Sequence, residues 1–317
     1  MLGNPIAIFH GSAHPQLARD ICLDLDMPVG LAKVGHFSDG ETSCEVLRNV
    51  RGVDCYIVQP TCSPTNDNLF EVLTLADALR RSNAASITAV MPYYGYARQD
   101  RRGNRRVPIS AKLVADMLNA AGVNRVVAVD LHATQIEGFF SAPMHIENLY
   151  ARPVLREYLR AAYGGKDVVV VSPDAGGVER ARGMAKLLNT DLAIIDKRRE
   201  RANESEVMHL IGDVKDKVCL MIDDMIDTAG TLVKGADALM AHGAASVSAC
   251  ASHAVLSGEA REKIRNSVLR EVVVTDSIPH AFNDDEDGKI TVVPIGRMLA
   301  EAIRRIHNSD SVSTLNG

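Results

Sequence analysis

Short apolar runs that alternate with amphipathic segments constrain the fold of this chain more than any other feature. The runs are rich in valine and isoleucine, and the segments between them place apolar residues at helical spacing. Strands of this kind, separated by helices, predict parallel sheets that carry helices on both faces. The sequence therefore predicts an α/β fold. The strand-like runs are 6–9, 55–59, 86–91, 126–129, 168–171, 192–195, 218–222, 246–251 and 272–275, and the helix patterns include 68–81, 110–121, 177–188 and 232–242.

Two pairs of similar segments recur along the chain in the same order. Residues 76–89 read ADALRRSNAASITA and residues 236–249 read ADALMAHGAASVSA, with eight of the fourteen positions identical. Alanine-rich helices match by chance, but a second pair agrees: residues 124–132 (NRVVAVDLH) resemble residues 270–280 (REVVVTDSIPH). Such a repeat predicts a duplicated domain. We expect the last residues of the chain to pack back on the first domain, and the two tandem domains to span 1–147 and 148–317.

The composition argues against several classes of partner. The chain has a net charge of −5, which disfavours nucleic acid or an anionic membrane as the main partner. The first ten residues lack the basic and apolar segments of a secretory signal. The uncharged run 238–258 is rich in glycine, serine and histidine, which favours a buried helix and strand over a membrane span. The six cysteines form no CxxC pair, so we interpret them as reduced, mostly buried thiols of a cytoplasmic protein.

Residues 219–231, CLMIDDMIDTAGT, carry the strongest chemical pattern. A buried strand, 219–222, leads into Asp223 and Asp224, whose carboxylates suit vicinal hydroxyls or a hydrated cation. A linker then leads into a TAGT turn that opens a helix. Its small residues let backbone N–H groups, two threonine hydroxyls and the positive end of the helix dipole converge on one phosphate. A sugar phosphate fits both ends of the segment; the simpler alternative is an acidic strand end followed by a threonine N-cap.

Taken in this order, the segment resembles the motif of the phosphoribosyl diphosphate-binding proteins. Two enzyme classes share that motif, the phosphoribosyltransferases and the ribose-phosphate pyrophosphokinases. The chain resembles the second class, of the type found in bacteria and animals, over nearly all its length. The blocks that carry the resemblance are FSDGE (37–41), VRGVDCYIVQ (50–59), TNDNL (65–69), PYYGYARQDRR (92–102), DLHATQIEGFF (130–140), SPDAGGVERAR (172–182), IIDKRRERAN (194–203), the 219–231 segment, LAEAIRRIHN (299–308) and SVSTL (311–315).

This resemblance implies two phosphoribosyltransferase-like domains, each a parallel sheet flanked by helices. It implies an enzyme that transfers the β,γ-diphosphoryl group of ATP to ribose 5-phosphate, with Mg²⁺ as cofactor and a homohexamer as the assembly. ATP would bind without a P-loop, because the chain contains no GxxxxGK[ST]. The family builds its ATP pocket across a subunit contact, and the residues implied here are Phe37, Asp39, Glu41, Arg98, Gln99 and Asp100.

The resemblance also implies the groups that act on the phosphates. His132 and Asp174 are the implied magnesium ligands, and few are needed because Mg²⁺ keeps several waters. A lone histidine such as His132 is otherwise more often structural. Lys197 and Arg199 are the implied catalytic cations of a mobile loop, and we assign no general base. The implied pyrophosphate loop is Asp174, Ala175, Gly176 and Gly177, and the implied ribose 5-phosphate residues are Arg199, Asp223, Asp224, Asp227, Thr228, Ala229, Gly230 and Thr231.

Three positions depart from the commonest family pattern. Glu137 stands where glutamine is usual, Asn49 stands where the animal enzymes carry serine, and the chain ends Leu-Asn-Gly without the usual aromatic residue. The last two lie near residues that the resemblance implies for regulation by phosphate and ADP, which are Arg51, Ser311 and Ser313.

Two rival functions remain open at this point. A phosphoribosyltransferase would use the same sugar-phosphate site with a nucleobase, and ATP dependence separates it from a synthetase. A catalytically silent synthetase-associated regulator typically carries an insertion beside the catalytic loop, and residues 194–203 show none.

Overall fold

The computed structural model describes residues 4–103, 106–198, 207–280 and 288–316. The chain divides into two compact units. Unit 1 comprises Met1–Tyr150, Ser277–Pro279 and Ile295–Gly317, and unit 2 comprises Ala151–Asp276 and His280–Pro294. Each is described by itself.

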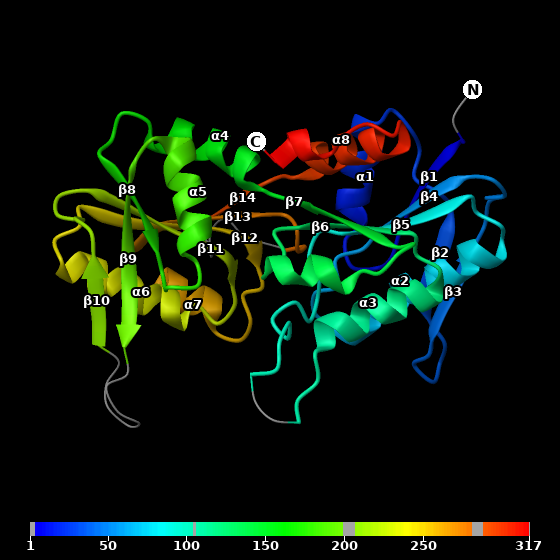
Figure 1. Ribbon diagram of the computed structural model, residues 1–317, viewed down its shortest axis with the longest axis horizontal. Coiled ribbons are helices and arrows are strands. Elements are labelled where there is room, and N and C mark those ends of the chain that lie inside the picture. The colour runs from blue at the N-terminus through cyan, green and yellow to red at the C-terminus, as the bar shows by residue number, and fades with distance from the viewer. Residues whose placement is uncertain (1–3, 104–105, 199–206, 281–287, 317) are drawn as a thin grey trace. The chain divides into compact units, whose positions relative to one another are not determined.

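Unit 1 is built on a five-stranded parallel sheet. Its order is β1 (Ile6–His10), β4 (Asp54–Val58), β5 (Ser86–Met91), β6 (Arg125–Val129) and β7 (His145–Leu149). Figure 1 shows α1 (Pro15–Asp24) and α8 (Gly296–His307) on one side of this sheet, and α2 (Thr65–Arg81) and α3 (Ser110–Ala121) on the other.

The strands of unit 1 bury both faces, as parallel strands do. Phe9, Ile57 and Ala89 belong to the core under α2 and α3. Their neighbours Ile8 and Val58 are equally buried on the opposite face. A two-stranded antiparallel hairpin, β2 (Ala32–His36) and β3 (Thr42–Val46), also belongs to this unit.

Unit 2 contains a seven-stranded sheet. Its order is β10 (Val207–Ile211), β9 (Asp191–Arg198), β8 (Val168–Ser172), β11 (Val218–Ile226), β12 (Ser246–Ala254), β13 (Leu269–Thr275) and β14 (Ile290–Val293). Among the described strands of this sheet, β10 alone is antiparallel to its neighbour.

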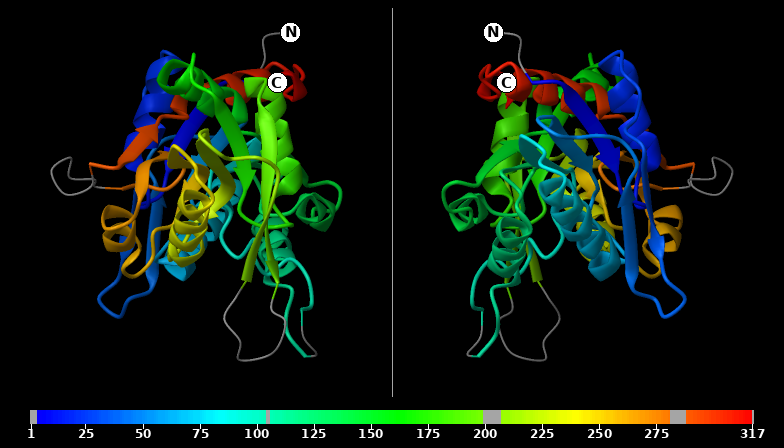
Figure 2. Two further views of the ribbon diagram at one scale, coloured as in Figure 1. Left: turned by 90° about the vertical axis from the view of Figure 1, so that its left-hand side faces the viewer. Right: turned by 90° about the vertical axis from the view of Figure 1, so that its right-hand side faces the viewer.

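The helices of unit 2 cover both faces of its sheet (Figure 2). The core under α6 (Gly230–Ala241) and α7 (Ala260–Arg265) contains Leu232, Ile264 and alternate strand residues such as Met221. The pair α4 (Arg152–Tyr163) and α5 (Val178–Leu188) lies together, and α5 packs on β8, β9 and β11. The remaining helical turns of the described chain are η1 (Thr134–Phe139) and η2 (Ser313–Asn316), both in unit 1.

The predicted α/β class, with parallel sheets flanked by helices, is confirmed. Three predicted strand ends are wrong: β9 continues past residue 195 to Arg198, β11 past residue 222 to Ile226, and β12 past residue 251 to Ala254. The extensions of β9 and β11 carry charged residues, which a sequence pattern assigns to a loop. Pairing with β10 and β12 extends these strands.

The domain bounds 1–147 and 148–317 stay a prediction. In the structure, unit 1 also includes Ile295–Gly317, and therefore the last helix, α8. Within the described ranges, no helix is long and apolar enough to cross a membrane.

Candidate active site

The strands β8 and β11 of unit 2 are parallel neighbours, so their carboxyl ends lie at the same edge of the sheet. The SPDAGG turn follows β8, and the DTAGT turn follows β11. Ligands of open parallel sheets bind at such edges. The two turns that the sequence predicts for phosphate groups therefore belong to one edge of one sheet.

Asp223 and Asp224 lie inside β11, near its carboxyl end, and not after it as the sequence predicted. The Asp224 side chain is almost fully buried, whereas that of Asp223 is 35% exposed. Arg180 of α5 reaches both carboxylates, with Nη1–Oδ1 distances of 3.5 Å to Asp223 and 3.3 Å to Asp224. Arg180 belongs to the SPDAGGVERAR block, but the sequence assigned it no role. Its contacts with the two aspartates depend on the packing of α5 against β11.

Burial raises the pKa of the Asp223 carboxyl to about 7, and the neighbouring Asp224 adds to this rise, while Arg180 opposes it. The Asp223 Oδ1 atom also accepts a hydrogen bond from the Asp224 main-chain N–H at 2.8 Å. The site thus contains two neighbouring carboxyl groups that both pair with Arg180. The Asp223 carboxyl group is partly exposed to solvent, and that of Asp224 is buried.

The turn between β11 and α6 has the backbone of an anion site. Ala229 lies in the left-handed region at φ +58°, directly before α6 begins at Gly230. A non-glycine residue there is uncommon, and such residues cluster at functional sites. Among the described residues, no side chain caps the start of α6. Its first N–H groups therefore point at the turn without a helical partner.

Neighbouring side chains hold the same turn in place. Ser257 Oγ donates to the Asp227 carboxylate, and the Ser257 main-chain N–H donates to the Asp227 carbonyl at 3.1 Å. Lys263 Nζ lies 3.5 Å from the Thr228 carbonyl oxygen. Asp227 is therefore bound to the loop that follows β12.

The SPDAGG turn is closed by its own aspartate. Asp174 Oδ1 accepts the Gly177 N–H at 2.9 Å, and Ser172 Oγ donates to the Asp174 carbonyl at 2.7 Å. Asp174, Ala175 and Gly176 are all exposed. An added Cβ at Gly177 would lie 3.1 Å from Ser172 Oγ, so a larger residue would crowd the turn. One oxygen of Asp174 fixes the turn, and the carboxylate still faces solvent.

The two implied catalytic cations lie at or beyond the end of β9. The Lys197 main chain lies within this strand, opposite Met208 of β10, and not in a loop after residue 195 as the sequence predicted. Arg199 lies outside the described residues.

In unit 1, His132 follows β6 in a sharply turned segment. Asp130 has a left-handed φ of +42°, and its N–H donates to the Leu149 carbonyl at 2.8 Å. The chain then turns away from the sheet, and His132 is exposed. Among the described residues, no three His, Cys, Asp or Glu side chains form a metal-binding group.

A pocket of about 610 Å³ lies beside the end of β5. It is lined by Arg98 and Gln99, both predicted for ATP, together with residues that the sequence analysis gave no role: Thr65, Asn66, Tyr93, Tyr96 and Ala97. Tyr93 and Tyr96 belong to the PYYGYARQ block. Their aromatic side chains directly after a strand were the sequence signal that could have identified them as pocket residues.

Side-chain hydrogen bonds hold two of the predicted ATP residues of this segment, Gln99 and Asp100. Ser110 Oγ donates to Gln99 Oε1 at 2.6 Å. The Gln135 amide donates to the Asp100 carboxylate, which is nearly buried. Gln135 belongs to η1, so the segment after β5 and the His132 segment are joined.

The FSDGE segment forms the tip of the β2–β3 hairpin. The Phe37 N–H donates to the Glu41 carbonyl at 2.8 Å, and the Glu41 N–H donates to the Asp39 carboxylate at 3.1 Å. The Phe37 side chain is 59% exposed. None of the described contacts brings this tip to Arg98 or Gln99.

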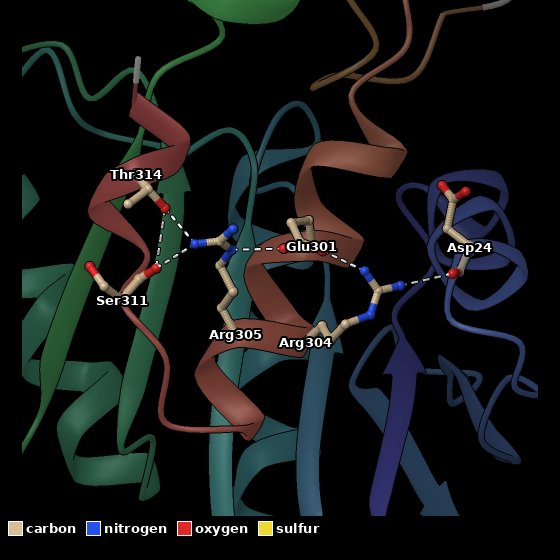
Figure 3. Close-up of polar contacts among 6 residues, drawn as sticks. All are labelled: Asp24, Glu301, Arg304, Arg305, Ser311 and Thr314. Atoms are coloured by element: carbon tan, nitrogen blue, oxygen red, sulfur yellow. Dashed lines mark hydrogen bonds and ion pairs between the residues drawn. The ribbon is translucent and has the colours of Figure 1, made fainter.

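The three residues implied for regulation lie in unit 1. Ser311 and Ser313 contact each other through their hydroxyls at 2.7 Å. Arg305 donates to the Ser311 carbonyl at 3.0 Å, as Figure 3 shows. Arg51 lies in the turn before β4, where its N–H donates to Asn49 Oδ1 at 3.1 Å.

Known proteins resemble this chain over nearly all its length. Two family models match it: the N-terminal domain of ribose phosphate pyrophosphokinase at residues 6–122, and the phosphoribosyl synthetase-associated domain at residues 198–316. A ribose-phosphate pyrophosphokinase of Chromobacterium violaceum is 56% identical over 311 residues, which is 98% of this chain and 94% of that protein. A protein of the same name from Marinomonas is 54% identical over 98% of this chain and 99% of its own length. The crystal structure of phosphoribosylpyrophosphate synthetase from Mycobacterium smegmatis matches with a TM-score of 0.90 at 39% identity, covering 96% of this chain and 99% of that chain.

Proposed function

The chain belongs to the ribose-phosphate pyrophosphokinase family, and we propose that it transfers the β,γ-diphosphoryl group of ATP to the C1 hydroxyl of ribose 5-phosphate. The products are 5-phosphoribosyl 1-diphosphate and AMP. The observation that carries this function is the edge of unit 2 where two carboxylates precede a left-handed turn and the uncapped start of α6. A phosphorylated sugar supplies both the hydroxyls and the phosphate that such an edge binds.

We assign ribose 5-phosphate to this edge. Asp223 and Asp224 accept hydrogen bonds from the 2- and 3-hydroxyls, since carboxylates are the strongest acceptors for neighbouring hydroxyl groups. The backbone from Asp227 to Thr231 holds the 5-phosphate, because the left-handed Ala229 turns consecutive N–H groups toward one anion. Arg180 keeps both carboxylates oriented through its contacts at 3.3 and 3.5 Å.

We assign ATP to residues of unit 1 and to the pocket beside β5. Arg98 and Gln99 line that pocket, and Tyr93 and Tyr96 offer aromatic surface for a purine. The Phe37 hairpin tip is exposed, which supports the proposal that it completes the ATP pocket of a second copy in a homohexamer.

The residues present fit a hydrated magnesium ion. Asp174 offers an exposed carboxylate whose turn is fixed by its own bond to Gly177, and Mg²⁺ takes one or two carboxylates and keeps its waters. We propose Asp174 as a magnesium ligand. We also propose His132 as a ligand of magnesium carried by the nucleotide. Bound there, Mg²⁺ would neutralise charge on the phosphate oxygens.

The C1 oxygen of the sugar attacks the β-phosphorus, the bond from that phosphorus to the α,β-bridging oxygen breaks, and AMP leaves. Negative charge rises on the β-phosphoryl oxygens, and positioned cations stabilise it most where water is excluded. We propose Lys197 and Arg199 for this role. No general base is assigned.

Regulation by phosphate and ADP, through Arg51, Ser311 and Ser313, is also proposed. The six cysteines are free thiols and five of them are buried, which supports a reducing, cytoplasmic setting.

Release of AMP by the purified protein tests the proposed function. With Mg·ATP, we expect AMP only when ribose 5-phosphate is present. Lys197→Ala should lower the rate by about a hundredfold or more, because it removes charge stabilisation at the transferring group. The exposed Lys215→Ala is the matched control and should keep the wild-type rate. Wild-type protein that binds phosphoribosyl diphosphate but forms no sugar-dependent AMP would point to a transferase or a silent regulator instead.

A further inference from the structure

The segment that carries His132 leaves the sheet of unit 1 at a defined point. Asp130 still donates its N–H to the Leu149 carbonyl at 2.8 Å, as a last rung of the β6–β7 ladder. Its left-handed φ of +42° then turns the chain, so the next N–H, that of Leu131, finds no main-chain carbonyl of β7 in line. Leu131 is 6% exposed, and a buried N–H needs a partner.

Asn148 of β7 provides that partner with its side chain. Its Oδ1 atom accepts the Leu131 N–H at 3.1 Å, one residue before His132. A side-chain amide thereby replaces the main-chain acceptor where the ladder ends.

Glu137 fixes the orientation of the same amide. Asn148 Nδ2 donates to Glu137 Oε1 at 2.9 Å. The Leu131 N–H can only donate and the Glu137 carboxylate can only accept, so a single orientation of the Asn148 amide satisfies both neighbours. Glu137 lies in η1, five residues after His132, so the Asn148 side chain contacts the chain both before His132, at Leu131, and after it, at Glu137.

The main chain of Asn148 is held from the other side by the C-terminal tail. Asn316 Nδ2 donates to the Asn148 carbonyl at 3.3 Å, and the Tyr150 N–H donates to Asn316 Oδ1 at 3.1 Å. Asn148, which holds the chain beside His132, is therefore fixed by β6 on one side of β7 and by the C-terminal tail on the other.

We propose that Asn148 and Glu137 are positioning residues that set the place of His132 for the nucleotide. This inference rests on the proposed function, which assigns His132 to the magnesium ion carried by ATP. Neither residue touches the reacting atoms. Their effect is to hold the chain before and after His132, so that less of the main chain at this residue has to be ordered when Mg·ATP binds.

A donor–acceptor exchange tests the proposal most sharply. Asn148→Asp keeps the acceptor for the Leu131 N–H but places a carboxylate against Glu137. We expect it to lower kcat/KM for Mg·ATP by about tenfold or more, with the KM for ribose 5-phosphate unchanged. Glu137→Gln alone keeps an acceptor and should stay within about threefold of wild type. In the double variant the new amide donates to the new carboxylate, so kcat/KM should return to within about threefold of wild type.

A matched variant separates positioning from general stability. Asn124 makes the same kind of bond at the amino ends of β5 and β6, where its Oδ1 accepts the Ile87 N–H at 2.8 Å. Asn124→Ala and Asn148→Ala should both lower the melting temperature. Only Asn148→Ala should lower kcat/KM for Mg·ATP.

Hydrogen exchange of the Leu131 amide gives a readout that needs no activity. We expect exchange at this amide to quicken by about tenfold or more in Asn148→Ala, and to stay unchanged in Asn124→Ala. Unchanged Leu131 exchange in Asn148→Ala, or a double variant no better than Asn148→Asp, would overturn the proposal. If Leu131 exchange responds as expected while His132→Ala keeps full activity, the bonds stand but the role of His132, and with it this inference, fails.

Discussion

At Asp223, the burial that affects stability coincides with the proposed sugar site. Asp223 lies in a strand, is two-thirds buried, and faces a second carboxylate with one arginine between them. These surroundings raise its pKa, with burial as the first cause. A bound sugar would supply hydroxyl donors to these carboxylates, so the cost of holding them ionised in the free protein falls when substrate binds.

Asp223→Asn should stabilise the substrate-free protein in a pH-dependent way. The folded-state pKa lies above the unfolded value near 3.9, so the folded protein binds more protons in the window from about pH 4 to 7. Wild-type stability therefore falls as pH rises through this window, and the asparagine variant escapes that loss. With a discount for solvent exposure, we expect a gain of about 1 kcal/mol at pH 8, or about 2 °C in melting temperature, and no gain near pH 4.5.

Melting curves of wild type and variant between pH 4.5 and 8 measure this difference. The exposed Glu262→Gln, on α7, is the control for the loss of one negative charge. A gain of the same size at both ends of the pH range would show that the effect is not linked to the Asp223 proton.

Sequence patterns predicted this site but could not predict its geometry. The order of strand, paired acids and TAGT turn predicted a sugar-phosphate edge from residue types alone. The left-handed Ala229 and the contacts of Arg180 depend on how α5 and α6 pack against β11, and no spacing along the chain encodes that packing. Likewise, Asn148 was part of no predicted site, because its role depends on where β6 leaves the sheet.

At the scale of elements, α8 links the C-terminal tail to α1 within unit 1. Figure 3 shows Glu301 between two arginines: Arg305 Nε lies 2.7 Å from Glu301 Oε1, and Arg304 pairs with the other oxygen. Arg304 also donates to the Asp24 carbonyl at 3.1 Å, and Arg305 donates to the tail at Ser311. One carboxylate thus orients both arginines toward different parts of the unit.

Glu301→Gln should weaken this link by a small, pH-dependent amount. The hydrogen bond from Arg305, followed by that from Arg304, lowers the pKa of Glu301. A lowered pKa contributes stability above the unfolded value near 4.3 and loses it as pH falls through the folded value. Because the side chain is one-third exposed, we expect a loss of about 0.5 kcal/mol at pH 7 and a smaller difference near pH 4. Melting temperatures of wild type and variant at the two pH values check this, and a difference that grows toward acid pH would contradict it.

The two repeated segments also correspond as elements. Residues 76–89 cover the end of α2 and the start of β5, and residues 236–249 cover the end of α6 and the start of β12. The corner between helix and strand contains a left-handed residue at the same place in both, Asn83 at φ +58° and Gly243 at φ +87°. The strand ends at 195 and 222 were missed because charged residues within strands carry no apolar signal, and neighbouring strands decide where such strands end.

At the scale of the whole molecule, the residues proposed for substrate binding in each unit follow the carboxyl ends of parallel strands. In unit 1 these are the segments after β5 and β6, and in unit 2 the turns after β8 and β11. The chain is acidic overall, so we expect its phosphate ligands to depend on local N–H groups and a few arginines and lysines rather than on a general field. Within each unit, this position of the proposed residues follows from the alternation of strands and helices that the sequence displays.

The measurement that tests the central claim most directly is phosphorus NMR of the purified protein with Mg·ATP and ribose 5-phosphate. Attack at the β-phosphorus predicts equal amounts of AMP and of a sugar that carries a diphosphate at C1 and a phosphate at C5. Formation of ADP with a singly phosphorylated C1, or no consumption of ATP that depends on the sugar, would contradict diphosphoryl transfer as the reaction of this chain.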